Sequence, residues 1–299
     1  MDKLIRGFLA DRAVSFYAIS ASELVEKAKR THDCGATASA ALGRSLMACV
    51  MMGAMLKDTG DVSLIIKGGG PAGSIICAAK SDGSVKGTIG DPKAELPKRA
   101  DGKLDVSGIV GKNGTLTVVR DMGLKEPYVG QSRLVSGEVA QDVAAYFTYS
   151  QQQPSLVYLG VHINKDFEVA AAGGVIIQPL PFCPDDVIDR LEQTQSSTGT
   201  FTTLLESGFT PEQAIKRLFS DLSPEFSEAV VPEYRCDCSR ERLAQVLVSL
   251  GAEELRDMIQ KDGGAELQCH FCNKMYNFSA EELETALTYA LGGGDGQHI

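Results

Sequence analysis

Four of the eight cysteines lie in two close pairs near the C-terminus, and this arrangement constrains the fold more than any other feature of the sequence. The first pair is Cys236 and Cys238, and the second is Cys269 and Cys272. Two thiol pairs at this spacing, joined by a loop, form the ligand pattern of a tetrahedral Cys₄ zinc site. We therefore predict one Zn²⁺ ion per chain, bound by these four sulfurs.

The same four sulfurs are also candidates for redox chemistry. Zinc keeps cysteine ligands as thiolates, which is the form that oxidants attack. Within each pair the partner sulfur is within reach, and a disulfide across one intervening residue, as in Cys236-Asp237-Cys238, would be constrained and easily reduced. A plain zinc ribbon without a redox role explains the spacing as well, so both interpretations stay open here. His270 is a weak candidate ligand, because four cysteines already complete a tetrahedron.

Composition bounds the remaining possibilities. The chain has 299 residues, 43% of them hydrophobic and 23% charged, which is typical of a soluble globular protein with more than one domain. A net charge of −10 argues against nucleic acid or an anionic membrane as a partner. The apolar stretch 34–56 is rich in Ala, Gly and Met and contains Arg44, so we expect a buried core helix there rather than a membrane span. With no secretory signal visible, we expect a cytoplasmic protein, and we expect Cys34, Cys49, Cys77 and Cys183 to be inert buried thiols.

Hydrophobic periodicity divides the chain into four predicted parts. Residues 1–180 form an α+β core domain in which strands and their turns alternate with a few helices. Residues 181–232 form a helical linker that carries nine acidic and three basic side chains, so it needs a docking partner to stay folded. Residues 233–291 form the cysteine module, and residues 292–299 a flexible tail. Expected strands in the core are 62–66, 74–78, 85–89, 115–120, 155–163 and 167–177, and expected core helices cover about 20–30, 34–56 and 137–150.

Inside the cysteine module the pattern predicts two helices, two strands around the second cysteine pair, and a last helix. The first helix begins after Ser239 and should bury Leu243, Val246, Leu247 and Leu250, which share one helical face. Ser279 and Glu282 form a capping box for the last helix. A module of roughly 60 residues has a marginal core, and a structural zinc contributes about 10–16 kcal/mol in peptides of this kind. We therefore expect the module to unfold without its metal.

The run from Tyr234 to Arg242, which includes Cys236-Asp237-Cys238-Ser239-Arg240, resembles the redox-regulated 33 kDa heat-shock chaperone family. The second pair, Cys269-His270-Phe271-Cys272, completes the family's cysteine motif. The resemblance extends to Gly60-Asp61, the glycine-rich run 68–71 and the run 172–175, and it keeps the order of core, linker and zinc module. It therefore covers essentially the whole chain.

This resemblance implies an ATP-independent holdase and not an enzyme, with no catalytic residues. The reduced, zinc-bound form would be a monomer of low activity. Oxidation would form the disulfides Cys236–Cys238 and Cys269–Cys272 and release the zinc. The module and linker would then unfold, the protein would dimerise, and the exposed apolar surface would bind unfolding client proteins. We place that surface on the linker and on the core face beneath it.

Two other function classes compete with this interpretation. A zinc-ribbon adaptor without redox gating would bind nucleic acid or protein, but residues 233–291 carry eleven acidic and six basic side chains, the wrong sign for phosphate. A thiol oxidoreductase would place its C-x-x-C at a helix N-terminus, whereas Cys269 and Cys272 lie between two strand-like runs. The glycine-rich run 68–73 lacks the Lys-Ser/Thr ending of a phosphate loop, so we expect a tight turn.

Overall fold

The computed structural model describes residues 1–56, 60–195 and 200–292, and the predicted tail beyond Gly292 lies outside this range. The chain divides into two compact units, Met1–Arg235 and Cys236–Ile299. The first unit contains two β-sheets and the second a small two-stranded sheet, with helices in both, so the predicted α+β class is confirmed. No described helix meets the length and apolarity that a membrane crossing requires.

Sheet A, as we name the five-stranded sheet, is antiparallel throughout. Its strands, in spatial order, are β10 (Glu225–Val230), β1 (Lys3–Leu9), β2 (Val14–Ser20), β9 (Val169–Pro179) and β8 (Leu156–Ile163). Strand β10 belongs to the predicted helical linker and was not expected. Its residues are mostly exposed, so no buried face marks it as a strand in the sequence. It is a strand because it pairs with the edge of β1, a long-range contact that local sequence does not encode.

Sheet B, the six-stranded sheet, is antiparallel except at one edge. Its strands, in spatial order, are β11 (Glu233–Tyr234), β5 (Ser84–Ile89), β4 (Ser74–Lys80), β3 (Asp61–Lys67), β6 (Thr115–Asp121) and β7 (Tyr128–Arg133). The predicted turn at 68–73 joins β3 to β4, and a side chain at Gly68 would meet the carbonyl oxygen of Val110 at 2.2 Å. Strand β7 was not predicted, and β11 runs parallel to β5.

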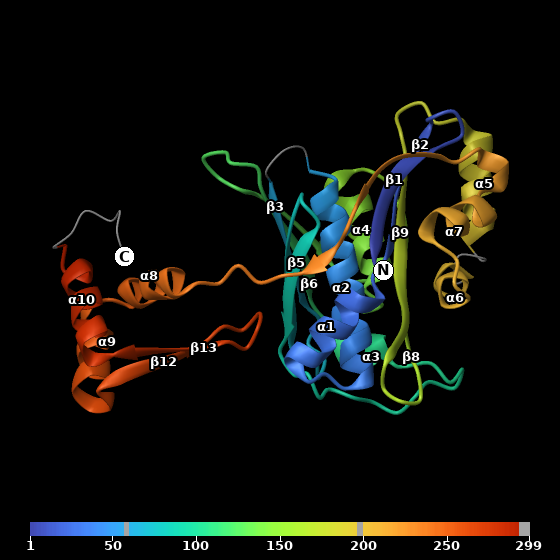
Figure 1. Cartoon of the computed structure of the whole chain (residues 1–299). Helices are drawn as coiled ribbons and strands as arrows, with labels where there is room; N and C mark the ends of the chain where they lie inside the picture. Colours follow the sequence, from blue (N-terminus) through green and yellow to red (C-terminus); the bar gives the residue numbers. More distant parts are fainter. Residues whose placement is uncertain (57–59, 196–199, 293–299) are drawn as a thin grey trace. The chain divides into compact units, whose positions relative to one another are not determined.

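The apolar stretch that resembles a membrane span is helix α2 (Ala36–Ala54), and it lies between the two sheets, as Figure 1 shows. Small residues let strands of both sheets approach it closely, and nearly all of its residues are buried. Helices α1 (Ser22–His32), α3 (Val106–Val110) and α4 (Ala140–Gln151) complete this layer. The carboxylate of Asp2 caps α1 by accepting from the backbone N–H groups of Glu23 (3.1 Å) and Leu24 (2.7 Å).

The linker helices cover the opposite face of sheet A (Figure 1). They are α5 (Asp185–Gln195), α6 (Thr200–Glu206) and α7 (Pro211–Leu218), followed by a 3₁₀ turn at Ser220–Leu222. A capping box of Thr210 and Gln213 opens α7. Despite the acidic composition, the linker buries a full set of apolar side chains against the sheet: Val187, Leu191, Phe201, Leu204, Ala214, Ile215, Phe219 and Leu222. The outer face of sheet A supplies their partners: Ile5, Leu9, Val14, Phe16, Ala18, Val175 and Ile177.

The second unit follows the predicted order of elements. Its elements are α8 (Arg240–Leu250), α9 (Ala252–Asp257), a π-helical turn at Met258–Asp262, β12 (Gly264–Gln268), β13 (Met275–Ser279) and α10 (Ala280–Ala290). Ser239 caps α8, and the capping box of Ser279 and Glu282 opens α10, as predicted. Only Leu247 of the predicted α8 stripe is fully buried, whereas Val246 and Leu250 are 51% and 43% exposed. Two strands and three short helices leave too little interior to cover the whole stripe.

Candidate metal centre

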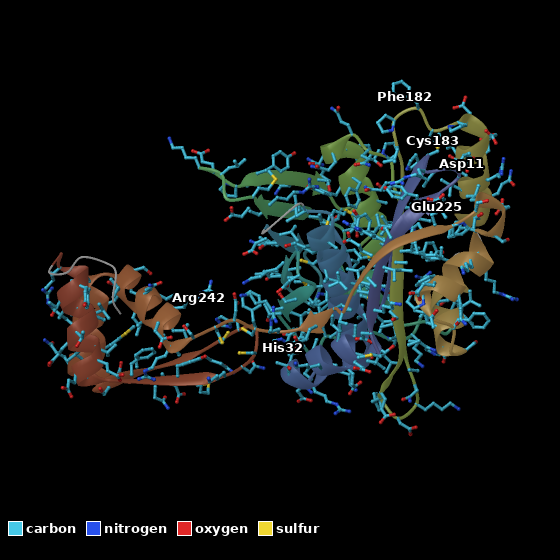
Figure 2. The ribbon with its side chains drawn as sticks, turned by 45° about the horizontal axis from the view of Figure 1, so that its top comes forward. Asp11, His32, Phe182, Cys183, Glu225 and Arg242 are labelled. Carbon is cyan, nitrogen blue, oxygen red and sulfur yellow. The ribbon has the colours of Figure 1, made fainter. Side chains whose placement is uncertain are left out.

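The first thiol pair lies on an extended segment between β11 and α8. Arg242, in the first turn of α8, donates from Nη1 to the backbone oxygen of Asp237 at 3.2 Å and pairs with its carboxylate at 2.9 Å. Figure 2 labels this arginine. Because Asp237 separates Cys236 from Cys238, these contacts fix the residue between the two thiols, and both sulfurs can then face the same side as the second pair.

The second thiol pair lies in the tight turn between β12 and β13. The backbone oxygen of Cys269 accepts from the N–H groups of Cys272 (3.3 Å) and Asn273 (2.8 Å), and the N–H of Cys269 donates to Lys274 (3.0 Å). Asn273 adopts a left-handed conformation with φ of 59°, which asparagine tolerates better than most residues. These bonds bend the backbone so that both sulfurs of the pair point the same way, as a zinc knuckle requires.

The four sulfurs meet in one cluster, with every Sγ within 4.8 Å of the others. Two contacts join the pairs, Cys236 to Cys269 at 3.7 Å and Cys238 to Cys272 at 3.4 Å. A Zn–S bond of about 2.3 Å in tetrahedral geometry places sulfurs about 3.8 Å apart, so the cluster has the size of a Cys₄ site. The structure thus brings together all four predicted residues, and they can hold a metal ion. His270 is exposed and is not part of the cluster.

Electrostatics within the cluster are uneven. Burial tends to raise the pKa of Cys238, but hydrogen bonds from the Tyr276 hydroxyl and the neighbouring thiols outweigh it and lower the pKa to about 7. Burial and the neighbouring thiols raise the pKa of Cys236 instead. One thiol of the cluster is therefore ready to ionise near neutral pH, and a bound cation would favour the thiolate at the others. Tyr276, which also contacts the backbone oxygen of Cys238 at 3.3 Å, had not been predicted as part of the site.

The module that carries the cluster has a small core of its own. Its buried members are Leu247, Leu255, Cys269, Tyr276, Phe278, Leu283 and Ala286. One of the thiols is therefore itself a core residue, and the other three pack against this core. A core this small rarely stabilises a domain alone, which supports a structural role for the metal.

The other thiols are separate from this cluster. Burial raises the pKa of Cys34 to about 12, and it also raises the pKa values of Cys49 and Cys77, both of which are buried in the core between the sheets. They fit the prediction of inert thiols. Cys183 differs because it is only partly buried and lies next to the fully exposed Phe182 at the start of the linker, as Figure 2 shows.

The residues just before the first thiol pair are fixed to sheet B, which the sequence did not predict. Tyr234 is 3% exposed, and its hydroxyl donates to the backbone oxygen of Gly87 (2.8 Å) and contacts His32 Nε2 (2.9 Å). The N–H of Arg235 donates to Val85 (2.9 Å), and its side chain pairs with Asp82 at 2.5 Å. The chain is thus held at the residue that precedes Cys236. The only feature of the sequence that could have indicated this attachment is the aromatic residue Tyr234, two positions before the first thiol.

The structure combines an α+β domain, a helical linker packed on one face of its sheet, and a small C-terminal module with a Cys₄ cluster of the size of a zinc site. This combination defines the class of protein to which the chain belongs. The family model for Hsp33 protein matches residues 2–279. The chain therefore belongs to the Hsp33 family of chaperones, and the resemblance seen in the sequence is confirmed.

Individual relatives match over nearly their full length. A 33 kDa chaperonin of Clostridium botulinum is 44% identical over 283 residues, which cover 94% of this chain and 96% of the relative. A 33 kDa chaperonin of Bacillus pumilus is 44% identical over 95% of this chain and 97% of its own. The crystal structure of the 33 kDa chaperonin from Thermotoga maritima superposes with a TM-score of 0.88, at 34% identity, over 97% of this chain and 99% of that one.

Proposed function

We propose that this protein is an ATP-independent holdase that is controlled by oxidation. In the reduced state Cys236, Cys238, Cys269 and Cys272 bind one Zn²⁺ ion, the protein is a cytoplasmic monomer, and its apolar surface is covered. The single observation that carries the proposal is the Cys₄ cluster with sulfur contacts of 3.4 and 3.7 Å in a unit with a small core. No catalytic residue is part of it.

The proposed switch is a change in the covalent state of the thiols. An oxidant such as hydrogen peroxide takes two electrons from each pair, the Cys236–Cys238 and Cys269–Cys272 disulfides form, and each peroxide is reduced to two waters as it takes up two protons. The disulfide sulfurs are poor metal ligands, so the zinc is released. The module then loses about 10–16 kcal/mol of metal binding, which exceeds the whole stability of most small domains.

The proposed client surface is the interface between the linker and the outer face of sheet A. Bulky side chains, Phe201 and Phe219 among them, are fully buried there, and they belong to a cluster separate from the core between the sheets. Release of the linker would expose both sides of this cluster while the main core stayed intact. Apolar surface of this extent binds other exposed apolar chains, and it would also support a dimer of the oxidised form.

The route from the thiols to the linker runs along the backbone. Residues 225–235 form β10 on sheet A and then β11 on sheet B, and they connect the linker helices to Cys236. The strands themselves are short or exposed, because β11 has two residues and β10 is largely exposed, so the segment is held mainly by the contacts of Tyr234 and Arg235 with sheet B. Lys3 and Glu212 add an ion pair between β1 and α7. The apolar cluster under the linker helices remains the main attachment, so we propose that unfolding of the module acts together with mild heat before the linker separates from the sheet.

The test combines zinc release with chaperone activity. Reduced protein is treated with peroxide at a mild heat-shock temperature, while a chromogenic chelator reports zinc and light scattering reports aggregation of an unfolding client. We expect zinc release and aggregation suppression to appear together and to reverse with dithiothreitol. A Cys183→Ser variant should behave like the wild type, since this thiol lies outside the cluster.

Three results would contradict the proposal. Full suppression by the reduced form would indicate a chaperone without redox gating. Zinc binding without suppression in either state would favour an adaptor that uses the acidic module for protein contacts. Turnover of a disulfide substrate would indicate an oxidoreductase.

A further inference from the structure

The outermost strand of sheet A, β8, has one edge without a strand partner. Among residues 1–56, 60–195 and 200–292, no strand pairs with β8 on the side away from β9. An unpaired strand edge presents a row of backbone donors and acceptors to any extended chain that approaches it, and natural proteins usually cover or charge such edges.

The sheet register identifies the backbone groups that face outward. Ala21 donates to the backbone oxygen of Ala172 (2.9 Å), and the N–H of Ala172 donates to Ser22 Oγ (3.0 Å), so both backbone groups of Ala172 point toward β2. Val161 lies opposite Ala172 in β8 and cannot bond to it. In an antiparallel pair, such a residue directs its N–H and C=O away from the partner strand. By alternation the outward-facing residues are Val157, Leu159 and Val161.

A groove of about 880 Å³ follows this edge. Consecutive residues from Tyr158 to Lys165 line it, and they include side chains from both faces of the sheet, so the groove runs along the strand's edge rather than over one face. The opposite walls come from the loop around Lys103 and from α6. The edge is therefore open to a chain of extended conformation.

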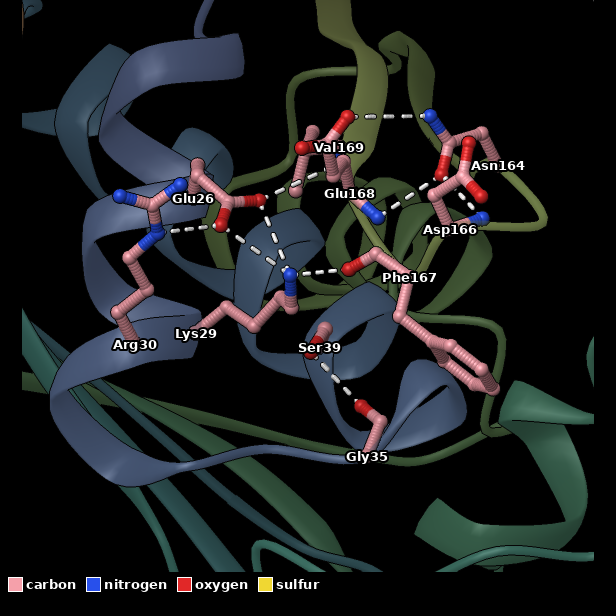
Figure 3. A network of polar contacts seen from close by, with 10 residues as sticks. All are labelled: Glu26, Lys29, Arg30, Gly35, Ser39, Asn164, Asp166, Phe167, Glu168 and Val169. Carbon is pink, nitrogen blue, oxygen red and sulfur yellow. Dashed lines mark hydrogen bonds and ion pairs between the residues drawn. The ribbon is translucent and has the colours of Figure 1, made fainter.

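The hairpin that carries the edge is held in place by α1, as Figure 3 shows. Glu26 Oε2 accepts from the N–H of Val169 at 3.0 Å, and Lys29 Nζ donates to the backbone oxygen of Phe167. Inside the turn, Asn164 Oδ1 accepts from the N–H groups of Asp166 and Glu168, both at 2.9 Å. A fixed edge loses little conformational entropy when a strand is added to it.

The charges in the groove select the occupant. Four cationic side chains line it, Arg44, Lys98, Lys103 and Lys165, against two carboxylates, Glu95 and Glu206. Arg44 is already paired with Glu138 at 2.6 Å, so three lysines remain to attract an occupant. This balance is opposite to that of the whole chain, which carries a net charge of −10. The groove therefore favours a segment with acidic side chains.

We propose that the free edge of β8 is a second client-binding site, which takes an extended, acidic segment of an unfolded polypeptide as an added strand. Backbone bonds to Leu159 and Val161 supply affinity for any sequence, and the lysines supply the preference for acidic segments. This proposal rests on the proposed function, because the client is the chain that a holdase binds. Helix α6 forms part of the groove wall, since a side chain at Gly160 would meet Thr202 Oγ1 at 2.1 Å. Release of the linker would therefore widen the groove.

The test uses a short fluorescent peptide in which Glu and Val alternate, with the oxidised full-length protein. Hydrogen exchange followed by NMR should show new protection of the Leu159 and Val161 amides, and none at Gly160 and His162, whose amides already face β9. Val161→Pro removes an outward N–H at an edge position where proline is tolerated, and it should weaken peptide binding roughly tenfold. Val161→Ala removes two methyl groups, more side chain than the proline variant loses, but keeps the N–H, and it should bind as the wild type does.

Two further peptides keep the test decisive if Val161→Pro does not fold. The peptide N-methylated on every residue, which blocks both of its edges, and a version with Lys in place of Glu should both bind the wild type at least roughly tenfold more weakly. Equal binding of the N-methylated peptide, no binding of the acidic peptide, or unchanged Leu159 and Val161 amides would overturn the proposal. So would a Val161→Pro variant that loses only dimerisation, because the edge would then pair with a second copy. Each of these results leaves the coupling of zinc release to aggregation suppression intact, so the two proposals fail separately.

Discussion

Phe219→Ala should activate the chaperone without oxidation. Phe219 is fully buried between the linker and the outer face of sheet A, in a cluster that is separate from the main core. Truncating a buried phenylalanine to alanine costs about 3–5 kcal/mol. Since the loss falls on the docked state of the linker, the undocked fraction should rise roughly 100- to 4,000-fold, because 1.4 kcal/mol is a factor of about ten.

Phe182→Ala is the matched control for this variant. It is the same chemical change in the same linker, but Phe182 is fully exposed and has no buried contact to lose (Figure 2). The assay is suppression of client aggregation by the reduced, zinc-loaded proteins, with hydrogen exchange of α5 to α7 as the measure of docking. Phe219→Ala should suppress aggregation and exchange faster, and Phe182→Ala should do neither. If exchange in Phe219→Ala shows an open linker while the reduced protein stays inactive, the covered face is not the client surface.

Further perturbations address the metal, the attachment of β11 and its pH dependence. Chelation of zinc, or Cys269→Ser, should abolish the amide protection of residues 240–290 while the core strands and helices within residues 1–180 stay protected, since the metal supplies about 10–16 kcal/mol to the smaller unit. Retained protection of residues 240–290 after verified zinc loss would contradict this. Tyr234→Phe, which keeps the ring but deletes a buried hydroxyl, should lower stability by about 1–2 kcal/mol in urea unfolding and speed exchange in β11; exchange at the wild-type rate would show that the hydroxyl does not hold the strand. Burial raises the pKa of Asp82, but hydrogen bonds from Ser84 and the nearby Arg235 outweigh it and lower the pKa overall. The pair with Arg235 therefore contributes above the ordinary carboxyl pKa of about 4 and is lost as the pH falls through the lowered value. The protection factors of the β11 amides, measured relative to the intrinsic exchange rate at each pH, should therefore fall in acid in the wild type, and Asp82→Asn should show low protection already at neutral pH.

The parts of the fold that follow local rules could be predicted from the sequence. The thiol spacing, the capping box at Ser279 and the small-residue helix α2 each have a local physical cause, and each lies where it was expected. The misses have non-local causes. Strand β10 exists because β1 offers it an edge, and α1 is capped by Asp2 from the start of the chain rather than by its own flanking residues.

The candidate site shows the same division. The spacing of the four cysteines was enough to predict that their sulfurs lie close together, because a tetrahedrally coordinated ion requires that geometry. The supporting contacts of Tyr276 and Arg242 depend on how α8 and β13 pack, and no spacing rule reports that. The apolar surface of the linker was not apparent from its acidic composition. Its large apolar side chains are separated by polar residues in the sequence, and they form one cluster only when α5, α6 and α7 pack on sheet A.

Strand β2 takes part in two interiors at once. Phe16 and Ala18 face the linker, whereas Ile19 belongs to the core around α2. In a holdase of the proposed kind, the side of this strand that faces α2 would stay buried in every state of the protein. The side that faces the linker would become exposed to solvent at every activation. In a saturation mutagenesis scan along residues 14–20, the phenotype should then alternate from one residue to the next. Substitutions on the linker side should give variants that are activated too readily by stress, and substitutions on the core side should give variants that do not accumulate in the cell.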